Sequence, residues 1–379
     1  MSHFVSSSTK DHSCVRSLFC SDPNLFVASE EWKLLTKGFK LVRVLNLEGR
    51  DFSKIPSNLG NFIHLRSLRI DSNYIQSVPD SICNLQNLQT LDIGPSTMTF
   101  RIYKHYPISF PYEISNLKHL RHVYTYRPIK LRFNSSKSNG EVMWHLQTIG
   151  FIALDKKTTY LVEKASFPKL KTLRLCISSD FKGDAPKMLL SLQQLKHLNK
   201  LAIDMEWKAN YKLLKVLQSL KHITHLKILK IIINDLELVT SAPMFPPNIT
   251  KLTLSHIMCL NDAGMKAIGS LTKLQVLILI GKEWCANTYL VLNCVEDGFP
   301  QLKEFQMKTL QVRNWKLANG SMPRLQTLVI DTCYYLDSLP SELWSLTTLR
   351  KVHVRKPSNA IARLLQDLEV NNRCELIVE

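Results

Sequence analysis

The chain has 379 residues and a formal net charge of +18, from 49 lysines and arginines against 31 aspartates and glutamates. This excess of positive charge favours acidic partners, such as nucleic acid, an anionic membrane or an acidic protein surface, but says nothing about the fold. No apolar run approaches the roughly 18 residues of a membrane-spanning helix, and residues 1–14 lack the apolar core of a signal peptide. We therefore expect a cytoplasmic protein without a transmembrane segment.

Residues 1–38 are predicted to form a polar tail followed by an entry repeat that caps the array. Residues 1–11 are rich in serine, and the apolar residues of 15–20 indicate a strand. A short helix is expected around 30–35, on the segment that leads to the next strand. Nothing in this part of the sequence indicates a catalytic group.

From residue 39 the chain repeats itself. An apolar frame with residues at its first, fourth, seventh and ninth positions begins at Phe39 and recurs at Phe62 and Leu85, so its starts are equally spaced. A pair ending in proline keeps the same step, since Ile55-Pro56 returns as Val78-Pro79. A fixed period of about 20–29 residues with this spacing is the signature of a leucine-rich repeat.

Alternation within the frame explains its spacing. Along 67–71 apolar and polar residues alternate, so Leu68 and Ile70 are predicted to point into a core while Arg69 and Asp71 face solvent. One repeat cannot bury enough apolar surface to offset its loss of backbone entropy, which amounts to about 1–2 kcal/mol per residue. Repeats must therefore stack, and the sequence predicts an α/β leucine-rich-repeat solenoid, a horseshoe with a concave parallel β-sheet.

Later frames follow with less regular steps. About 13 repeats are predicted over 39–357, and a helix at 360–368 with a last strand at 374–378 is predicted to cap the end, over 358–379. Residues 94–109 are interpreted as an insertion, and the frame that starts at Met143 competes with a register that starts at Leu146. Strands are predicted with centres near residues 45, 68, 91, 123, 173, 201, 229, 252, 277, 305, 328 and 352.

A known family shares several of these segments. The run 41–49, the Ile55-Pro56 pair and residues 59–61 resemble the first repeats of plant coiled-coil, nucleotide-binding, leucine-rich-repeat disease-resistance proteins, in particular the late blight resistance group. The runs 15–19 and 167–173 resemble the entry strand and the mid-array repeats of that family. The resemblance implies a non-catalytic recognition and regulatory domain of an intracellular immune receptor. Its partners would be a pathogen effector or a host guardee, and the nucleotide-binding module of the same receptor class.

The chain departs from that family in one respect. Family members carry a phosphate-binding loop, and the nearest string here, 264–269, is followed by serine rather than by the required lysine. We therefore expect no cofactor, and a fragment or truncated form that lacks the nucleotide-binding module. The alternative is a free-standing repeat adaptor that scaffolds signalling proteins. An upstream nucleotide-binding module in the same transcript would favour the first interpretation.

Metal and catalytic sites are not expected. His119 and His122, and likewise His222 and His225, are close in sequence, but neither pair has a carboxylate or cysteine at helical spacing. We interpret all four as surface histidines. The nine cysteines form no Cys-x-x-Cys pair and are expected to be free thiols in a reducing compartment.

Two sets of residues are candidates for protein contact. The stretch 101–137 contains eight lysines and arginines, one acidic residue and interleaved tyrosines, which favours docking to an acidic protein surface; a solvated insertion and a nucleic-acid strand are the alternatives. The outward positions of the predicted strands form the second set, because tyrosine and arginine often dominate interfaces. The candidates are Arg69, Asp71, His122, Tyr124, Tyr126, Arg127, Lys130, Arg132, Arg174, Asp204, Lys230, Lys308, Lys351, His353 and Arg355.

Overall fold

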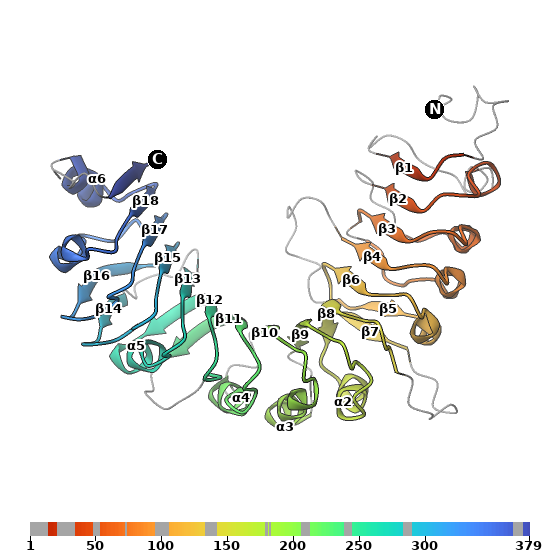
Figure 1. The fold of residues 1–379 in the computed structure, drawn as a ribbon, viewed down its shortest axis with the longest axis horizontal. Coiled ribbons are helices and arrows are strands. Elements are labelled where there is room, and N and C mark those ends of the chain that lie inside the picture. Colours follow the sequence, from red (N-terminus) through yellow and green to blue (C-terminus); the bar gives the residue numbers. More distant parts are fainter. Residues whose placement is uncertain are drawn as a thin grey trace. The chain divides into compact units, whose positions relative to one another are not determined.

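The structure is a computed structural model that describes residues 14–20, 35–47, 54–72, 74–94, 106–132, 142–178, 181, 183–205, 213–238, 245–282, 290–366 and 374–379. The chain divides into two compact units. The first comprises 1–183 with 194–198, and the second comprises 184–193 with 199–379. In each unit the strands lie on one side and the helices on the other (Figure 1).

The first unit is a ladder of parallel strands. Its strands pair in the order β1 (Ser17–Cys20), β2 (Val44–Leu47), β3 (Ser67–Ile70), β4 (Thr90–Ile93), β6 (His122–Thr125), β8 (Thr148–Ala153) and β9 (Thr172–Ile177). The return segments are the 3₁₀ helices η1 (Ser57–Asn61), η2 (Asp80–Asn84) and η3 (Tyr112–Asn116) and the helix α2 (Lys156–Glu163). Three of the return segments, η1 to η3, start directly after a proline, whose fixed φ suits the first turn of a helix.

The seventh position of each frame forms the core of this ladder. Leu45, Leu68 and Leu91 lie opposite one another on consecutive strands and are at most 1% exposed. Ile149 continues this column, opposite Val123 on one side and Leu173 on the other. The frame that starts at Met143 is therefore the correct one of the two registers near that position.

A short second ladder follows the main strands where the period is interrupted. β5 (Ile108–Phe110) pairs in parallel with β7 (Ile129–Leu131), and Ser77 forms an isolated parallel bridge with Ser109. β5 therefore begins inside the predicted insertion 94–109 and adds hydrogen bonds between return segments. Of the helix expected at 30–35, only Leu35 lies within the described residues, and it is helical together with residues 36–38.

The second unit is a ladder of the same kind with longer strands. Its strands pair in the order β10 (Lys200–Met205), β11 (Ile228–Leu238), β12 (Lys251–Leu260), β13 (Val276–Gly281), β15 (Glu304–Lys308), β17 (Thr327–Asp331), β18 (Lys351–Arg355) and β19 (Glu375–Val378). β14 (Leu290–Cys294) and β16 (Val312–Leu317) form a separate two-stranded sheet. The helices are α3 (Ala185–Leu190), α4 (Leu213–Leu220), α5 (Asp262–Gly269) and α6 (Asn359–Gln366), with the 3₁₀ helices η4 (Ser191–Gln194) and η6 (Ser341–Ser345).

All twelve predicted strand centres lie in or directly beside strands of the structure, and the parallel solenoid is confirmed. The predicted end helix and last strand correspond to α6 and β19. The proposed division into an entry repeat (1–38), repeats (39–357) and a terminal cap (358–379) stays a prediction.

Candidate functional site

On the solvent-facing side of strands β3, β4 and β6, two predicted contact residues, Arg69 and Tyr124, lie on either side of Asp92. Arg69 lies opposite Asp92, and Asp92 lies opposite Tyr124 on the next strand. The Arg69 guanidinium donates from Nη1 to Oδ2 of Asp92 at 2.5 Å, and both side chains remain partly exposed. Asp92, which was not among the predicted contact residues, therefore lies between two that were, Arg69 and Tyr124.

Tyr124 is exposed, and a glycine on the next strand lies close to its backbone. On β8, a Cβ at Gly150 would lie 2.9 Å from the Cα of Tyr124, so only glycine permits this close approach. The ring is 42% exposed and stacks on His122, with centroids 6.1 Å apart and planes inclined by 7°. His122 is half-buried, and its Nδ1 is 3.1 Å from the hydroxyl of Thr148.

Three further predicted contact residues of this unit, Asp71, Tyr126 and Arg174, are less exposed than Tyr124. Asp71 and Tyr126 are both half-buried, and a Cβ at Gly94 would lie 3.0 Å from the Cβ of Tyr126. Arg174 lies over the ring of Phe151, with its guanidinium carbon 4.0 Å from the ring centroid. None of these three side chains is classed as exposed.

Arg127 is buried, which corrects the expectation that it is a surface residue. It is 5% exposed. Its Nε donates to the carbonyl oxygen of Tyr106 at 2.6 Å, and its Nη1 donates to that of Ile75 at 3.0 Å. The guanidinium is thus buried and provides donors for two backbone carbonyl groups. Burial lowers the pKa of Arg127.

Arg132 and Lys130 differ in their surroundings. Arg132 donates from Nη2 to the carbonyl oxygen of Val78 at 2.8 Å and forms an ion pair of 3.1 Å with Asp80, so much of its bonding capacity is used within the unit. Lys130 on β7 is exposed. Arg101, Lys104 and Lys137, which also belong to the predicted basic stretch, lie outside the described residues.

In the second unit the predicted residues lie on several strands. Lys230 is exposed on β11, while Lys308 on β15 and Arg355 on β18 each lie opposite Asp331 of β17. On β18, Lys351 pairs with Glu375 at 3.4 Å and Arg355 pairs with Glu379 at 3.2 Å. The cations on β15 and β18 thus face acidic neighbours in the same ladder.

Two of the predicted contact residues in this unit are buried, which corrects the expectation of exposure. Asp204 is 4% exposed, because β10 is longer than the first strands of the first unit and three consecutive residues at its end are covered. His353 is 9% exposed, and its Nε2 lies 3.2 Å from a carboxylate oxygen of Glu379 in the segment that ends β19. Neither side chain offers a free contact surface.

A column of cations that sequence analysis missed lies just before the strands of the first unit. Its members follow the fourth residue of each frame and are joined through the backbone: Arg43 N–H donates to the Arg16 carbonyl at 2.7 Å, and Arg66 N–H donates to that of Arg43 at 2.7 Å. We call this set the basic column. It consists of Arg16, Arg43, Arg66, Gln89, Arg121, Gln147 and Lys171, and its five cations are exposed.

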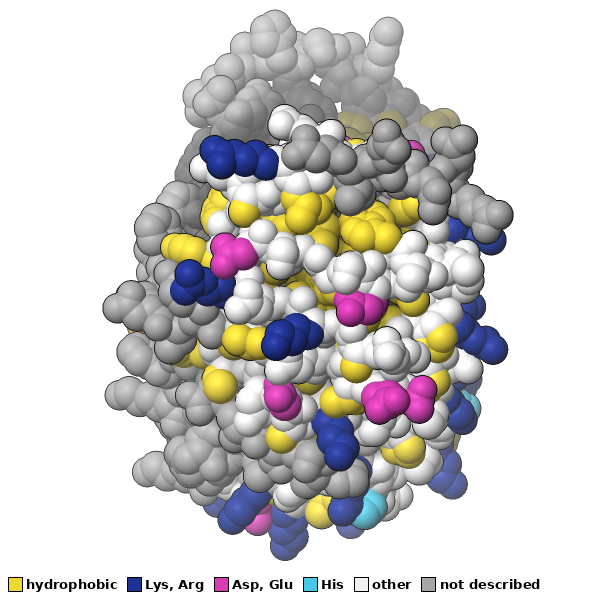
Figure 2. Space-filling model, turned by 90° about the vertical axis from the view of Figure 1, so that its left-hand side faces the viewer, with side chains coloured by type: hydrophobic (Ala, Val, Ile, Leu, Met, Phe, Trp, Pro, Cys, Tyr) yellow, Lys and Arg dark blue, Asp and Glu magenta, His cyan; other side chains and the backbone are white. Residues whose placement is uncertain are grey.

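The turns that carry the basic column contain no acidic residue. Over 40–43, 63–66, 86–89, 118–121, 144–147 and 168–171 the sequence has seven lysines and arginines and three histidines, with no aspartate or glutamate. Neighbouring strands are about 4.8 Å apart, so these like charges repel one another. On the side of the second unit seen in Figure 2, by contrast, side chains of both signs are interspersed. Comparing the aligned frames position by position would have revealed the column.

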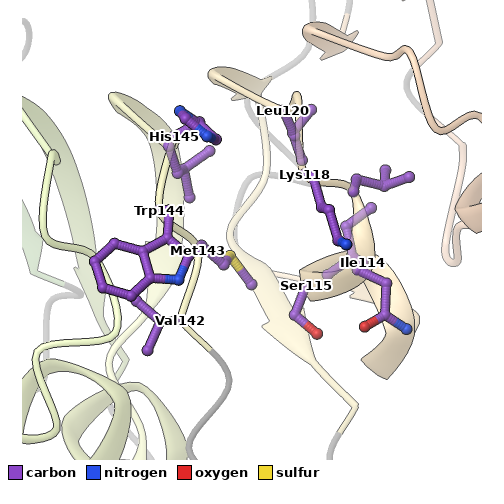
Figure 3. Close-up of a pocket in the computed structure, with 11 residues that line it drawn as sticks. Ile114, Ser115, Lys118, Leu120, Val142, Met143, Trp144 and His145 are labelled. Carbon is purple, nitrogen blue, oxygen red and sulfur yellow. The ribbon is translucent and has the colours of Figure 1, made fainter.

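A pocket opens beside this column within the first unit. It has a volume of about 460 Å³ and lies between the end of η3 with its following turn and the turn that leads into β8. Trp144 and Met143 lie on one side of it, and Lys118, Ser115 and Ile114 on the other (Figure 3). The lining residues are Ile114, Ser115, Asn116, Leu117, Lys118, Leu120, Val142, Met143, Trp144, His145 and Leu146.

The described residues show no metal site and no phosphate-binding loop. Among them, no group of three or more histidine, cysteine, aspartate or glutamate side chains could hold a metal ion. The glycine string 264–269 lies on α5, where the Gly264 N–H donates to the side chain of Asn261. Seven cysteines are free thiols, of which Cys176, Cys294 and Cys333 are buried and Cys14 is exposed; the others are Cys83, Cys259 and Cys374.

Comparison with known families agrees with the repeat geometry. The family model described as "Leucine-rich repeat region" matches residues 15–373. The chain belongs to this leucine-rich repeat family.

Curated relatives of the chain include plant disease resistance proteins. The chain is 27% identical over 319 residues to disease resistance protein RPP8 of Arabidopsis thaliana, a match that covers 83% of the chain and 33% of the relative. It is also 27% identical to the probable disease resistance RPP8-like protein 2 of the same plant, over 87% of the chain and 35% of the relative. The chain thus spans about one third of the length of these relatives.

A solved structure supports the fold alone. A leucine-rich-repeat protein of Leptospira interrogans is 19% identical, with a TM-score of 0.51 over 96% of this chain and 89% of that one. No helix in the described part of the chain is both long and apolar enough to span a bilayer. The basic column and part of the pocket lining belong to the turns that directly precede the strands of the first unit.

Proposed function

We propose that this chain is the recognition and regulatory part of a plant intracellular immune receptor, acting in the cytoplasm without catalysis of its own. The observation that carries the proposal is the match of leucine-rich repeats over 15–373, together with similarity to disease resistance proteins. Repeats of this kind expose long rows of side chains and need no cofactor to bind a protein. Its partners are the nucleotide-binding module of the same receptor class and a pathogen effector or host guardee.

The proposed contact surface combines the strand face and the basic column of the first unit. Tyr124 supplies an exposed aromatic ring, and Arg69 and Arg121 supply guanidinium groups of the kind that interfaces favour. Among the other predicted contact residues, Asp71, His122, Tyr126, Lys130, Arg132 and Arg174 belong to the same unit, and Lys230, Lys308, Lys351 and Arg355 belong to the second. Attraction between this cationic surface and an acidic partner raises the association rate and is screened by salt.

Binding to the nucleotide-binding module of an RPP8-like relative tests the proposal. The purified chain and module should form a complex that can be isolated at low ionic strength, and Arg121→Glu should slow its association while flattening the salt dependence. Tyr124→Ala should instead speed dissociation, because it removes buried contact area. Lys273→Glu, an exposed cation of the second unit, is the control. Absence of a complex at low salt would contradict the proposal and favour a free-standing adaptor.

A further inference from the structure

The pocket beside Trp144 combines an apolar floor with a cationic rim. Leu117, Leu120 and Leu146 are each 3–4% exposed and form the base. Trp144 is 61% exposed, although a large aromatic side chain at the surface is usually at least partly covered. None of the eleven lining residues is acidic. The volume of about 460 Å³ falls within the range of about 300–1,000 Å³ that is typical of ligand pockets.

Charge at the rim favours an anionic ligand. Lys118 and His145 line the pocket, and Arg121 lies one residue beyond Leu120 in the basic column. Arg121 and Lys171 also lower the pKa of His122, after the larger effect of burial, so their positive field reaches the strand face. A carboxylate placed at this rim would be attracted by Lys118 and Arg121. Glu113, which directly precedes Ile114 in the sequence, does not line the pocket.

The cations continue on both sides of the pocket, which favours an extended ligand over a compact one. Backbone hydrogen bonds order the column as Arg66, Gln89, Arg121, Gln147 and Lys171. Four steps of about 4.8 Å separate Arg66 from Lys171, or about 19 Å. An extended peptide of about six residues covers that length at about 3.3 Å per residue. A small molecule in the pocket would leave the outer cations unused.

From these observations we propose that the pocket receives a bulky apolar side chain of an extended peptide segment from a partner protein. Acidic residues on either side of that anchor bind Lys118 and the basic column. This inference rests on the proposed function, protein recognition, and specifies the kind of segment that is recognised. Most of the apolar lining is aliphatic, and Trp144 is the only Trp, Tyr or Phe among the eleven lining residues. Nucleic-acid strands usually need several aromatic side chains on which successive bases stack, so this lining suits a single aliphatic or aromatic side chain better.

Two pairs of matched positions make the inference testable. The turn Leu117-Lys118-His119-Leu120 has the same four residues as the turn Leu195-Lys196-His197-Leu198, and both are closed by a backbone hydrogen bond between their ends. Lys196 is exposed but does not line the pocket. Likewise Ile63 occupies the same turn position as Trp144 and is 55% exposed. Lys196→Glu and Ile63→Ala therefore reproduce the change in charge or size elsewhere on the same unit.

The probe is a fluorescein-labelled synthetic peptide with one central leucine flanked on each side by two aspartates, together with a version that has a central phenylalanine. Binding is measured by fluorescence anisotropy at low ionic strength. Lys118→Glu and Trp144→Ala should each raise the Kd at least tenfold, while Lys196→Glu and Ile63→Ala change it less than threefold. Replacing the central leucine by serine, or the aspartates by asparagines, should also weaken binding at least tenfold. Circular dichroism melting confirms that each variant is folded.

Several outcomes would overturn the inference. Equal weakening by Lys118→Glu and Lys196→Glu would show binding to diffuse positive charge, and tighter binding of an oligothymidylate than of either peptide would identify a nucleic-acid site. Failure of both peptides to bind the wild-type chain would also overturn it. If the nucleotide-binding module still forms its complex in that case, the proposed function stands and only the pocket assignment fails. If the peptides bind but the module does not, the reverse holds.

Discussion

Arg127 donates a hydrogen bond from Nη1 to the carbonyl oxygen of Ile75, a residue 52 positions earlier in the chain. The same guanidinium also bonds Tyr106, so one side chain, just before β7, is linked to two segments of the preceding repeats. Backbone acceptors that are buried without a donor cost free energy. Arg127 is therefore a structural cross-link in the interrupted part of the array.

Removing this cross-link should destabilise the first unit. Arg127→Met keeps most of the apolar stem but leaves two carbonyl groups without their donor, and we expect a loss of about 2–4 kcal/mol in the free energy of unfolding. The exposed Lys130→Met on β7 should change it by less than about 0.5 kcal/mol. Urea denaturation followed by circular dichroism measures both. Similar midpoints for the two variants would mean that Arg127 is exposed in solution.

The contrast between these two residues shows what the sequence could and could not predict. Leu45, Leu68 and Leu91 could be placed in the core because a constant repeat period constrains every position of the frame. Arg127 and Lys130 are both basic residues in a stretch without a period. Arg127 is buried and Lys130 is exposed, and this difference arises where β5 pairs with β7, a contact between separate segments that no local pattern encodes.

The candidate site was predictable only in part, for a related reason. Tyr124 was selected correctly as an exposed residue, but the close approach of Gly150 in the next repeat to its backbone has no local signal in the sequence. His353 was expected to be exposed but is buried, and its Nε2 lies beside Glu379, which follows β19 and is distant in sequence. The basic column was visible in the sequence, since Arg43 and Arg66 share a position in their frames. It was missed because the charges were counted along the chain rather than across the repeats.

Core and face positions of one strand should respond differently to substitution. Leu68 is fully buried between Leu45 and Leu91, and Leu68→Ala should cost about 2–5 kcal/mol because it removes apolar contacts and leaves a cavity. Leu68→Asp should cost more, since it buries a carboxylate without a partner. Arg69→Gln, which loses a partly exposed ion pair with Asp92, should cost less than about 1 kcal/mol. Equal losses of thermal stability for Leu68→Ala and Arg69→Gln would refute the register.

The buried thiols should make the fold sensitive to alkaline pH. Burial raises the pKa of Cys333 to about 11 and that of Cys294 to about 12. In the unfolded chain these thiols ionise near pH 9, whereas in the folded chain they stay protonated to a higher pH. Their contribution to stability is therefore fully present below pH 9 and is lost as the pH rises toward the folded pKa values. The free energy of unfolding should therefore fall between pH 9 and 11, and Cys333→Ala should make that fall less steep. An unchanged slope in the variant would contradict the shift at Cys333.

Repulsion within the basic column should lower stability at low salt. Arg43 and Arg66 occupy neighbouring strand entries, and replacing either by glutamine should stabilise the first unit by about 0.2–1 kcal/mol. The gain should vanish at high salt, where the Debye length shrinks to about 3 Å. Arg350 holds the same frame position in the second unit but lies between Gln326 and Glu375. Arg350→Gln should therefore give no gain, and a gain there equal to that of Arg66→Gln would rule out repulsion as the cause.

The titration of His122 should report the field of the basic column directly. Burial lowers the pKa of His122 below its ordinary value of 6.5, and Arg121 and Lys171 lower it further. Because the folded state then binds fewer protons than the unfolded chain, the contribution of His122 to stability is present above pH 6.5 and declines as the pH falls below that value. Arg121→Gln and Lys171→Gln should each raise the pKa, and Lys130→Gln should not. Proton NMR of the imidazole against pH measures the shift; a value at or above 6.5 in the wild-type chain, or no response to Arg121→Gln, would show that the cations do not act on the strand face.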